Sequence, residues 1–169
     1  MSSQKVHDRS QLASILQEAK ADGAVVVTTN GCFDVLHLGH LRYLQAARQL
    51  GDLLVVAVNS DSSVQQLKGK NRPLVPEAER AEMLAGLECV SYVVIFPELT
   101  PIDLLSELKP NIHVKGGDYK LEELVEREVV EAYGGKVIVG LNVRGKSTTN
   151  LIEVICERYR TDTHPENAS

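Results

Sequence analysis

Unbroken apolar runs alternate with amphipathic segments, and this alternation constrains the fold of the chain more than any other feature. Five short runs rich in Val, Ile and Leu show no inside–outside alternation: 24–28, 53–59, 92–96, 112–115 and 137–139. Strands without a polar face are covered on both sides, as in a parallel sheet. Segments with helical periodicity surround them at 11–21, 38–50, 76–87, 101–108, 121–133 and 147–158. The sequence therefore predicts a doubly wound parallel α/β domain with right-handed crossovers.

The composition limits the classes of partner and compartment. The 169 residues suit one domain, which we expect over 1–160, followed by a polar and disordered tail at 161–169. A net charge of −5 argues against binding to duplex nucleic acid, because no basic excess is present to displace counterions. The longest apolar run, 53–58, is too short to span a membrane. Three widely spaced cysteines and no apolar leader in residues 1–10 predict a cytoplasmic protein with reduced thiols.

The stretch from Thr28 to His40 carries the clearest chemical signal. His37 and His40 stand three residues apart where a predicted strand meets a predicted helix, with Gly39 between them. A helix N-terminus presents unpaired N–H groups and a positive dipole end, which favour phosphate. Two imidazoles on one helix face can donate hydrogen bonds to neighbouring phosphoryl oxygens. The stretch therefore predicts a site for phosphoryl chemistry, in which Asp34 caps the helix or, as the less favoured alternative, orients an imidazole.

Zinc ligation by Cys32, His37 and His40 is the alternative interpretation of the same loop. A fourth ligand is not evident in the sequence. We therefore expect no protein-bound metal, and we expect phosphates to occupy the loop.

Three further segments carry candidate ligand-binding residues. Lys115-Gly116-Gly117-Asp118 ends a predicted strand, where it is either a tight turn or a nucleoside site. Lys68 and Arg72 lie in a glycine-containing loop that suits a triphosphate or a sugar phosphate, although a solvated loop fits as well. Residues 140–147 match the pattern G-x-x-x-x-G-K-S, but too little chain follows to supply the acidic strand of a P-loop kinase. Hydroxyls of residues 147–149 can still bind phosphate at a helix N-terminus.

The order of the strands decides whether these loops meet. In doubly wound sheets, ligands bind beyond the carboxyl ends of the strands, where the strand order reverses. In the order 3-2-1-4-5, the loops after the first and fourth strands flank that point. The residues alone do not fix this order.

Together these motifs resemble the cytidylyltransferase-like nucleotidyltransferase superfamily, and within it the adenylyltransferase domains of the bacterial ADP-heptose pathway. The likeness covers roughly residues 8–159. It is carried by 29–40, by Val58-Asn59-Ser60-Asp61, Leu67-Lys68-Gly69, Arg72-Pro73 and Arg80, and by 114–119 and 147–150. Two departures are Ser91, where relatives often carry Asp, and the basic 144–146 segment.

The resemblance implies a Rossmann-like five-stranded sheet in the order 3-2-1-4-5. It also implies a nucleotidyl transfer reaction. AMP would pass from ATP to D-glycero-β-D-manno-heptose 1-phosphate, with Mg²⁺ carried by the nucleotide phosphates. In many bacteria this domain follows a sugar kinase, so a domain standing alone implies a separate kinase. The catalytic residues would be His37, His40 and Lys68. The remaining contacts to the nucleotide and phosphates would come from Asn30, Gly31, Cys32, Phe33, Asp34, Gly39, Arg72, Lys115, Gly116, Gly117, Asp118, Ser147, Thr148 and Thr149.

Two alternatives stay open at this stage. One keeps the fold and uses CTP with a polyol phosphate or an amino-alcohol phosphate. The other is a non-catalytic regulator that binds nucleotides. The expected partners are small molecules, and neither nucleic acid nor a membrane is among them. The residues leave the oligomeric state open, with a homodimer among its alternatives.

Overall fold

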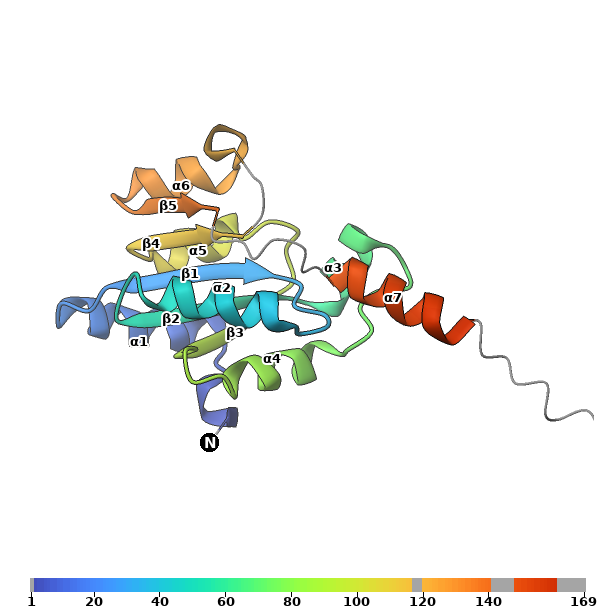
Figure 1. Cartoon of the computed structure of the whole chain (residues 1–169). Helices are drawn as coiled ribbons and strands as arrows, with labels where there is room; N and C mark the ends of the chain where they lie inside the picture. Colours follow the sequence, from blue (N-terminus) through green and yellow to red (C-terminus); the bar gives the residue numbers. More distant parts are fainter. Residues whose placement is uncertain (1, 117–119, 141–147, 161–169) are drawn as a thin grey trace, which may run out of the picture.

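A five-stranded parallel sheet forms the centre of the molecule (Figure 1). The structure is a computed structural model and describes residues 2–116, 120–140 and 148–160. The strands lie in the order β3-β2-β1-β4-β5, which confirms the predicted order. Their bounds are β1 (Val26–Gly31), β2 (Leu53–Asn59), β3 (Tyr92–Phe96), β4 (Ile112–Lys115) and β5 (Lys136–Val139).

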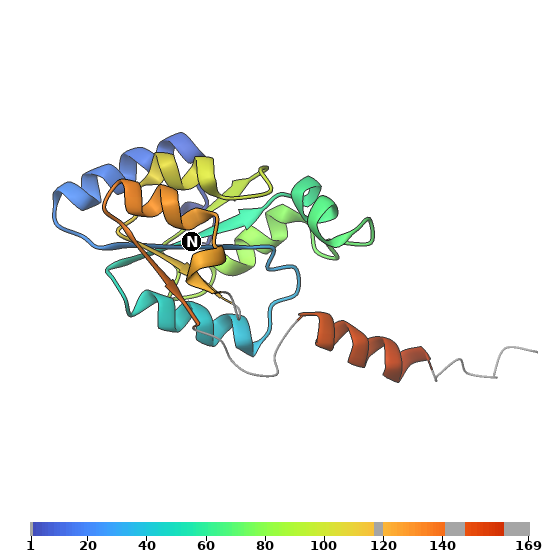
Figure 2. The ribbon, with the colours of Figure 1, turned by 90° about the horizontal axis from the view of Figure 1, so that it is seen from above.

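Helices cover both faces of this sheet, as a doubly wound domain requires (Figure 2). One face carries α1 (Arg9–Ala21), α5 (Ile102–Leu108) and α6 (Glu126–Ala132). The other carries α2 (Leu38–Arg48) and α4 (Glu77–Ala85). The chain runs outward from β1 through β2 to β3 and then returns past β1 to β4 and β5, so the strand order reverses between β1 and β4.

The central strand β2 shows why its sequence is apolar throughout. Val56 and Val58 are fully buried in the core under α2 and α4, while Val55 and Ala57 pack into the core under α1 and α5. Because each successive side chain points to the opposite face, a strand between two helical layers has no polar side. The prediction of a sheet buried on both faces is confirmed.

Strand β1 extends further toward the site than the apolar pattern predicts. It runs over Val26–Gly31 rather than 24–28, and Asn30 and Gly31 keep register with Ala57 and Val58 of β2. The Asn-Gly pair is polar and resembles a turn in sequence, yet the neighbouring strand holds it in the ladder. As a result, Asn30 is a residue of the sheet rather than of a turn.

The predicted helices are present with shifted ends, and one more helix is found. α3 (Asp61–Lys68) begins after Ser60, whose hydroxyl accepts a hydrogen bond from the N–H of Ser63 (3.2 Å). The predicted helix 121–133 is divided into a 3₁₀ turn, η2 (Leu121–Glu123), and α6, because Leu124 is extended. Another 3₁₀ turn, η1 (Ser2–Lys5), precedes α1.

Ser91 lies directly before β3 and forms hydrogen bonds with β2. Its hydroxyl accepts a hydrogen bond from the N–H of Leu54 (3.1 Å), and its own N–H donates to the carbonyl of Leu54 (2.9 Å). The serine at this departure from the family pattern therefore ties the start of β2 to the approach to β3.

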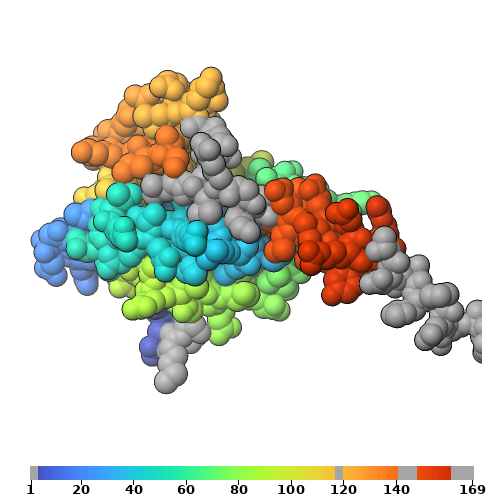
Figure 3. Space-filling model, viewed as in Figure 1, coloured from blue at the N-terminus to red at the C-terminus, as the bar shows by residue number. Residues whose placement is uncertain are grey.

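The last helix, α7 (Thr148–Arg160), projects from the body of the molecule (Figure 3). None of its side chains is buried, and Val154, Ile155 and Tyr159 are exposed. Within the described residues, no helix has both the length and the apolar character needed to cross a membrane.

Candidate active site

The junction between β1 and α2 brings the two histidines to the carboxyl edge of the sheet. After Gly31 the chain turns at Phe33, which has a positive φ of 48° and a buried ring. His37 is the N-cap of α2, and its Nδ1 accepts a hydrogen bond from the backbone N–H of His40 (3.4 Å). The prediction that Asp34 caps this helix is therefore wrong, because the imidazole of His37 occupies that position.

The two imidazole rings stack on each other. Their centroids are 3.9 Å apart with an interplanar angle of 20°. Since Nδ1 of His37 acts as an acceptor, the proton of the neutral His37 ring resides on Nε2. The cap therefore fixes the tautomer that can donate a hydrogen bond from Nε2.

His40 is held in its neutral form. Burial, and then the charge of neighbouring His37, lowers the pKa of His40 to about 4. The ring of Phe33 covers it, with centroids 5.3 Å apart. The Nδ1 atom of His40 is buried and has no hydrogen-bond partner among the described residues. At neutral pH the ring is thus an uncharged donor and acceptor next to the N-terminus of α2, which carries a partial positive charge.

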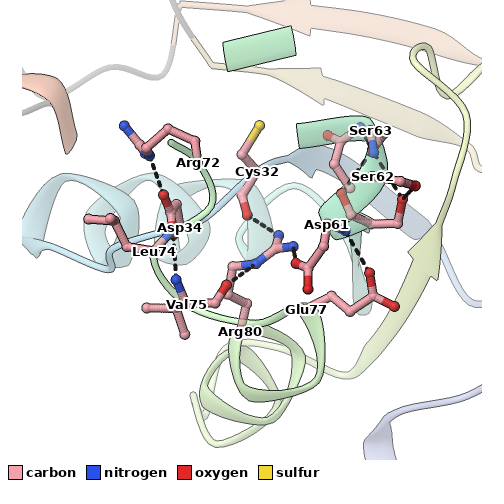
Figure 4. A network of polar contacts seen from close by, with 12 residues as sticks. Cys32, Asp34, Asp61, Ser62, Ser63, Arg72, Leu74, Val75, Glu77 and Arg80 are labelled. Carbon is pink, nitrogen blue, oxygen red and sulfur yellow. Dashed lines mark hydrogen bonds and ion pairs between the residues drawn. The ribbon is translucent and has the colours of Figure 1, made fainter. Parts of the chain in front are cut away.

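Asp34 holds the segment that follows α3 (Figure 4). Its buried carboxylate forms an ion pair with Arg72 and accepts hydrogen bonds from the N–H groups of Leu74 (2.7 Å) and Val75 (2.9 Å). The residue is 3% exposed, so these three partners compensate for the burial of its carboxylate. Asp34 and Arg72 thus connect two predicted site segments, and Arg72 is already paired.

Arg80 joins the same region from α4 (Figure 4). Its buried guanidinium donates to the carbonyls of Cys32 and Val75, and to Asp61 Oδ1 (2.7 Å). Burial raises the pKa of the Cys32 thiol, while the charges of Lys68, Arg80 and Arg72 act in the opposite direction. Four elements of the site region therefore meet at one buried arginine.

The end of β4 forms the opposite side of the site. Gly116 lies against the ring of Tyr43, and a Cβ at this glycine would come within 3.1 Å of that ring. The Tyr43 hydroxyl donates to the carbonyl of Val114 (3.0 Å) and accepts from the hydroxyl of Thr29 (2.6 Å). Burial raises the pKa of Tyr43 to about 12. Tyr43 of α2 thereby fastens the histidine helix to both β1 and β4.

Lys115 extends from the last position of β4 toward β1. Its Nζ donates to Asn30 Oδ1 (3.2 Å) and forms an ion pair with Glu126 of α6. The N-terminal turn of α7 also reaches the site, since the hydroxyl of Thr148 donates to the carbonyl of Val35 (3.3 Å).

The structure brings most of the predicted site residues to one edge of the sheet. Lys68 ends α3, with an exposed side chain whose charge acts on Cys32. Thr149 is exposed on α7, and no hydrogen bond ties it to the histidines. Gly117, Asp118 and Ser147 lie outside the described residues, as does the 144–146 segment.

Metal ligation was the alternative interpretation of the histidine loop. Among residues 2–116, 120–140 and 148–160, no group of three or more His, Cys, Asp or Glu side chains is arranged to hold a metal ion.

Sequence reasoning missed the roles of Tyr43, Arg80 and Glu126. Tyr43 and Arg80 fall on the buried faces of predicted helices, where a polar residue among apolar ones is the available signal. Glu126 is buried at the start of α6, and the sequence contains no mark of its partner 11 residues earlier.

The sequence places His113 inside the predicted strand 112–115, which favours a packed, hydrogen-bonded role over a catalytic one. The ring is fully buried in β4, and its Nδ1 shares a hydrogen bond with the hydroxyl of Thr28 (2.9 Å). That expectation is confirmed.

Two curated relatives match nearly the whole chain. The bifunctional protein HldE of Pelobacter propionicus is 56% identical over 158 residues, which are 94% of this chain and 32% of the relative. HldE of Geobacter sulfurreducens is 54% identical over 155 residues, 92% of this chain and 32% of the relative. The chain thus spans about a third of the length of these curated relatives.

Two solved structures share the fold. The lipopolysaccharide core biosynthesis protein from Thermoplasma volcanium has a TM-score of 0.59 and 33% identity, covering 69% of this chain and 94% of that one. Pantoate-β-alanine ligase from Francisella tularensis has a TM-score of 0.60 at 17% identity, covering 92% of this chain and 77% of that one, and shows the fold alone.

A family model described as cytidylyltransferase-like matches residues 28–167. This range begins at the strand that leads into the histidine loop and includes every predicted site residue. The chain therefore belongs to the cytidylyltransferase-like family and is a nucleotidyltransferase.

Proposed function

We propose that the chain transfers AMP from ATP to D-glycero-β-D-manno-heptose 1-phosphate and releases ADP-heptose and pyrophosphate. The observation that carries this proposal is the stacked pair of imidazoles at the N-terminus of α2, at the reversal of strand order. The similarity to HldE proteins over nearly the whole chain supports the choice of substrates, as does that to a lipopolysaccharide core biosynthesis protein.

The proposed reaction is one in-line displacement without a covalent enzyme intermediate. A phosphate oxygen of the sugar phosphate attacks the α-phosphorus of ATP, and the bond from that phosphorus to the β-phosphate bridging oxygen breaks. Pyrophosphate leaves with the electron pair of that bond. Charge grows on the equatorial and bridging oxygens, where Nε2–H of His37, the ring of His40 and the N–H groups of α2 donate hydrogen bonds.

The cations and hydroxyls of the surrounding loops would hold the phosphates. The charge of Lys68 acts on Cys32 of the histidine loop, and in this proposal Lys68 neutralises phosphate charge there. Arg72 could contact a phosphate only while it also keeps its ion pair with Asp34. In this proposal Thr148 and Thr149 bind phosphate oxygens together with Ser147, and Gly116, Gly117 and Asp118 hold the nucleoside.

Mg²⁺ enters this proposal on the nucleotide. The ion binds phosphate oxygens and waters in preference to a dedicated protein cage, and it would reduce the negative charge that the acceptor must approach. Among the described residues no cluster of carboxylates is arranged to hold the ion, and His40 offers a neutral imidazole.

Pyrophosphate release measured for each pairing of donor and acceptor tests the substrates. ATP and CTP are each combined with D-glycero-β-D-manno-heptose 1-phosphate, glycerol phosphate and ethanolamine phosphate, in the presence of Mg²⁺. We expect release with ATP and the heptose phosphate, and ADP-heptose as the product by mass spectrometry. Release only with CTP and an alcohol phosphate would replace the proposed substrates, and nucleotide binding without release from any pair would indicate a regulator.

A further inference from the structure

A cluster of polar side chains lies next to the end of the ladder between β1 and β4. Lys115 Nζ contacts both Asn30 Oδ1, at 3.2 Å, and the carboxylate of Glu126. The side chain of Lys115 is 16% exposed and that of Glu126 is 4% exposed. These residues come from β4, β1 and α6, so the contact joins three elements at the carboxyl edge.

The hydrogen-bonded pairing of β1 with β4 ends just before this contact. The register of β1 with β4 ends at Thr29 and Val114. Beyond that pair, Asn30 stays in register with Ala57 of β2, whereas Lys115 stays in register with Val139 of β5. Since the ladder between these two strands ends here, side chains rather than main-chain bonds connect them, at the edge where doubly wound sheets bind their ligands.

Glu126 keeps the lysine in place. Burial works to raise the pKa of Glu126, but the hydrogen bond and charge of Lys115 outweigh it and lower that pKa. The carboxylate is therefore ionised at neutral pH and fixes the ammonium group in a site where little water reaches either charge.

This arrangement determines what Asn30 can offer to a ligand. An ammonium group only donates hydrogen bonds, so the atom of Asn30 that faces Lys115 is the amide oxygen. The NH₂ group of Asn30 then has no hydrogen-bond partner among the residues that the structure describes. Because its oxygen faces Lys115, Asn30 directs its NH₂ donor away from the lysine.

We propose that Asn30 is a specificity residue that donates its NH₂ to an oxygen of a bound substrate, and that Lys115 and Glu126 are positioning residues that hold the amide in this orientation. A phosphoryl oxygen, an acceptor that carries negative charge, suits such a donor. This inference rests on the proposed function, since it concerns the same site. It assigns Lys115 to orienting a neighbour, although the sequence predicts that it binds the nucleotide directly.

The first test is Asn30→Asp, which preserves the shape of the side chain. The carboxylate can still accept from Lys115, but its second oxygen replaces the donor and would repel a phosphate. We expect kcat/KM to fall about 10- to 100-fold, through a higher KM for one substrate, while the melting temperature stays near that of the parent. Separate titration of ATP and of the sugar phosphate identifies which substrate bears the acceptor oxygen. A kcat/KM within twofold of the parent for both substrates would overturn the inference.

The second test removes both ions together. In Lys115→Met with Glu126→Leu, apolar side chains of similar size replace the pair, and such replacements are often tolerated in protein interiors. We expect a folded protein in which KM rises for the same substrate as in Asn30→Asp, because the amide is free to turn. A folded double variant with the parent KM values would contradict the positioning role. If the double variant does not fold, Glu126→Gln serves the same comparison.

Glu128→Gln is the matched control, since Glu128 is exposed on the same helix. It should leave both KM values unchanged. The parent protein in the same assay separates the two proposals: an inactive parent refutes the proposed function, whereas an active parent with unaffected Asn30→Asp and double variants refutes only the inference.

Discussion

A proton on Nδ1 of His37 and the hydrogen bond from the His40 N–H exclude each other, because the single lone pair of that nitrogen serves one partner. The ring can therefore cap α2 only while Nδ1 is unprotonated. Protonation at this atom would remove the cap and place a positive charge beside the neutral ring of His40, whose pKa is lowered by burial and by His37. The geometry thus favours catalysis by two neutral rings.

His40→Ala removes one preorganised donor from the site. We expect kcat to fall at least about 100-fold, since loss of one such donor commonly costs 10²–10³ in rate. ATP affinity, measured by titration calorimetry, should change much less. His7→Ala is the control, because His7 lies before α1, where its ring contacts Tyr92. A near-normal kcat in the His40 variant would contradict the assignment.

At the scale of elements, apolar patterning predicts the strands closely where both faces are buried. The bounds of β2, β3 and β4 match the predicted runs, whereas β1 is displaced toward its polar end. Helix α3 was not predicted because 61–68 is short and polar, with two serines near its start. Its stability comes from tertiary partners: Glu77 accepts from the N–H of Asp61 (2.6 Å), and Arg80 pairs with the Asp61 carboxylate. Local pattern carries no information about such partners.

The segment after α3 depends on Asp34. In Asp34→Ala the N–H groups of Leu74 and Val75 lose their acceptor and Arg72 loses its ion pair. We expect this change to destabilise the folded position of the segment by about 3–5 kcal/mol. Limited digestion with trypsin should then cleave after Lys68 or Lys70 much faster than in the parent. Asp22→Ala, at an exposed position after α1, should show the parent cleavage pattern. Equal digestion rates for the Asp34 variant and the parent would disprove this role.

The connection between α2 and β2 requires a glycine. A Cβ at Gly51 would lie 2.6 Å from the carbonyl oxygen of Val25 and 2.7 Å from Cγ2 of Val27. Because these backbone and core atoms cannot move aside without a cost in free energy, Gly51→Ala should lower the free energy of unfolding by about 1–3 kcal/mol in urea denaturation. Gly86→Ala is the matched control: φ is −70° and the nearest atom lies at 3.4 Å, so its stability should be unchanged or slightly raised. Equal stabilities of the two variants would argue against this steric explanation.

At the scale of the whole molecule, the sequence predicts which loops meet but not how they are joined. The order 3-2-1-4-5, expected from the family resemblance, brings the loops after β1 and β4 together. The cross-links themselves, Tyr43 to Val114 and Arg80 to Cys32, connect residues 71 and 48 positions apart. Pairings over such separations follow from the packed structure alone. Asp34 illustrates this limit: the local sequence predicts that it caps α2, whereas in the structure it forms an ion pair with Arg72.

The free energy of unfolding should depend on pH through buried His113. Burial, and then the charge of Lys115, lowers the pKa of His113 to about 3, although Glu126 acts in the opposite direction. Between pH 6.5 and pH 5 the unfolded chain binds a proton that the folded chain refuses, so stability falls as the pH falls. In His113→Asn this slope should decrease by up to about 1.4 kcal/mol per pH unit. Urea denaturation of both proteins across this interval measures it, and identical slopes would rule out the contribution.

Helix α7 offers a place to attach a spectroscopic probe. Its Cys156 is exposed, whereas Cys32 and Cys89 are partly buried and burial raises the pKa of both thiols. A maleimide dye should consequently react first on α7, with no cysteine needing to be engineered away. Because the first turn of this helix is bonded to the histidine loop through Thr148 and Val35, fluorescence anisotropy of the dye would test whether a nucleotide occupies the loop, as we propose.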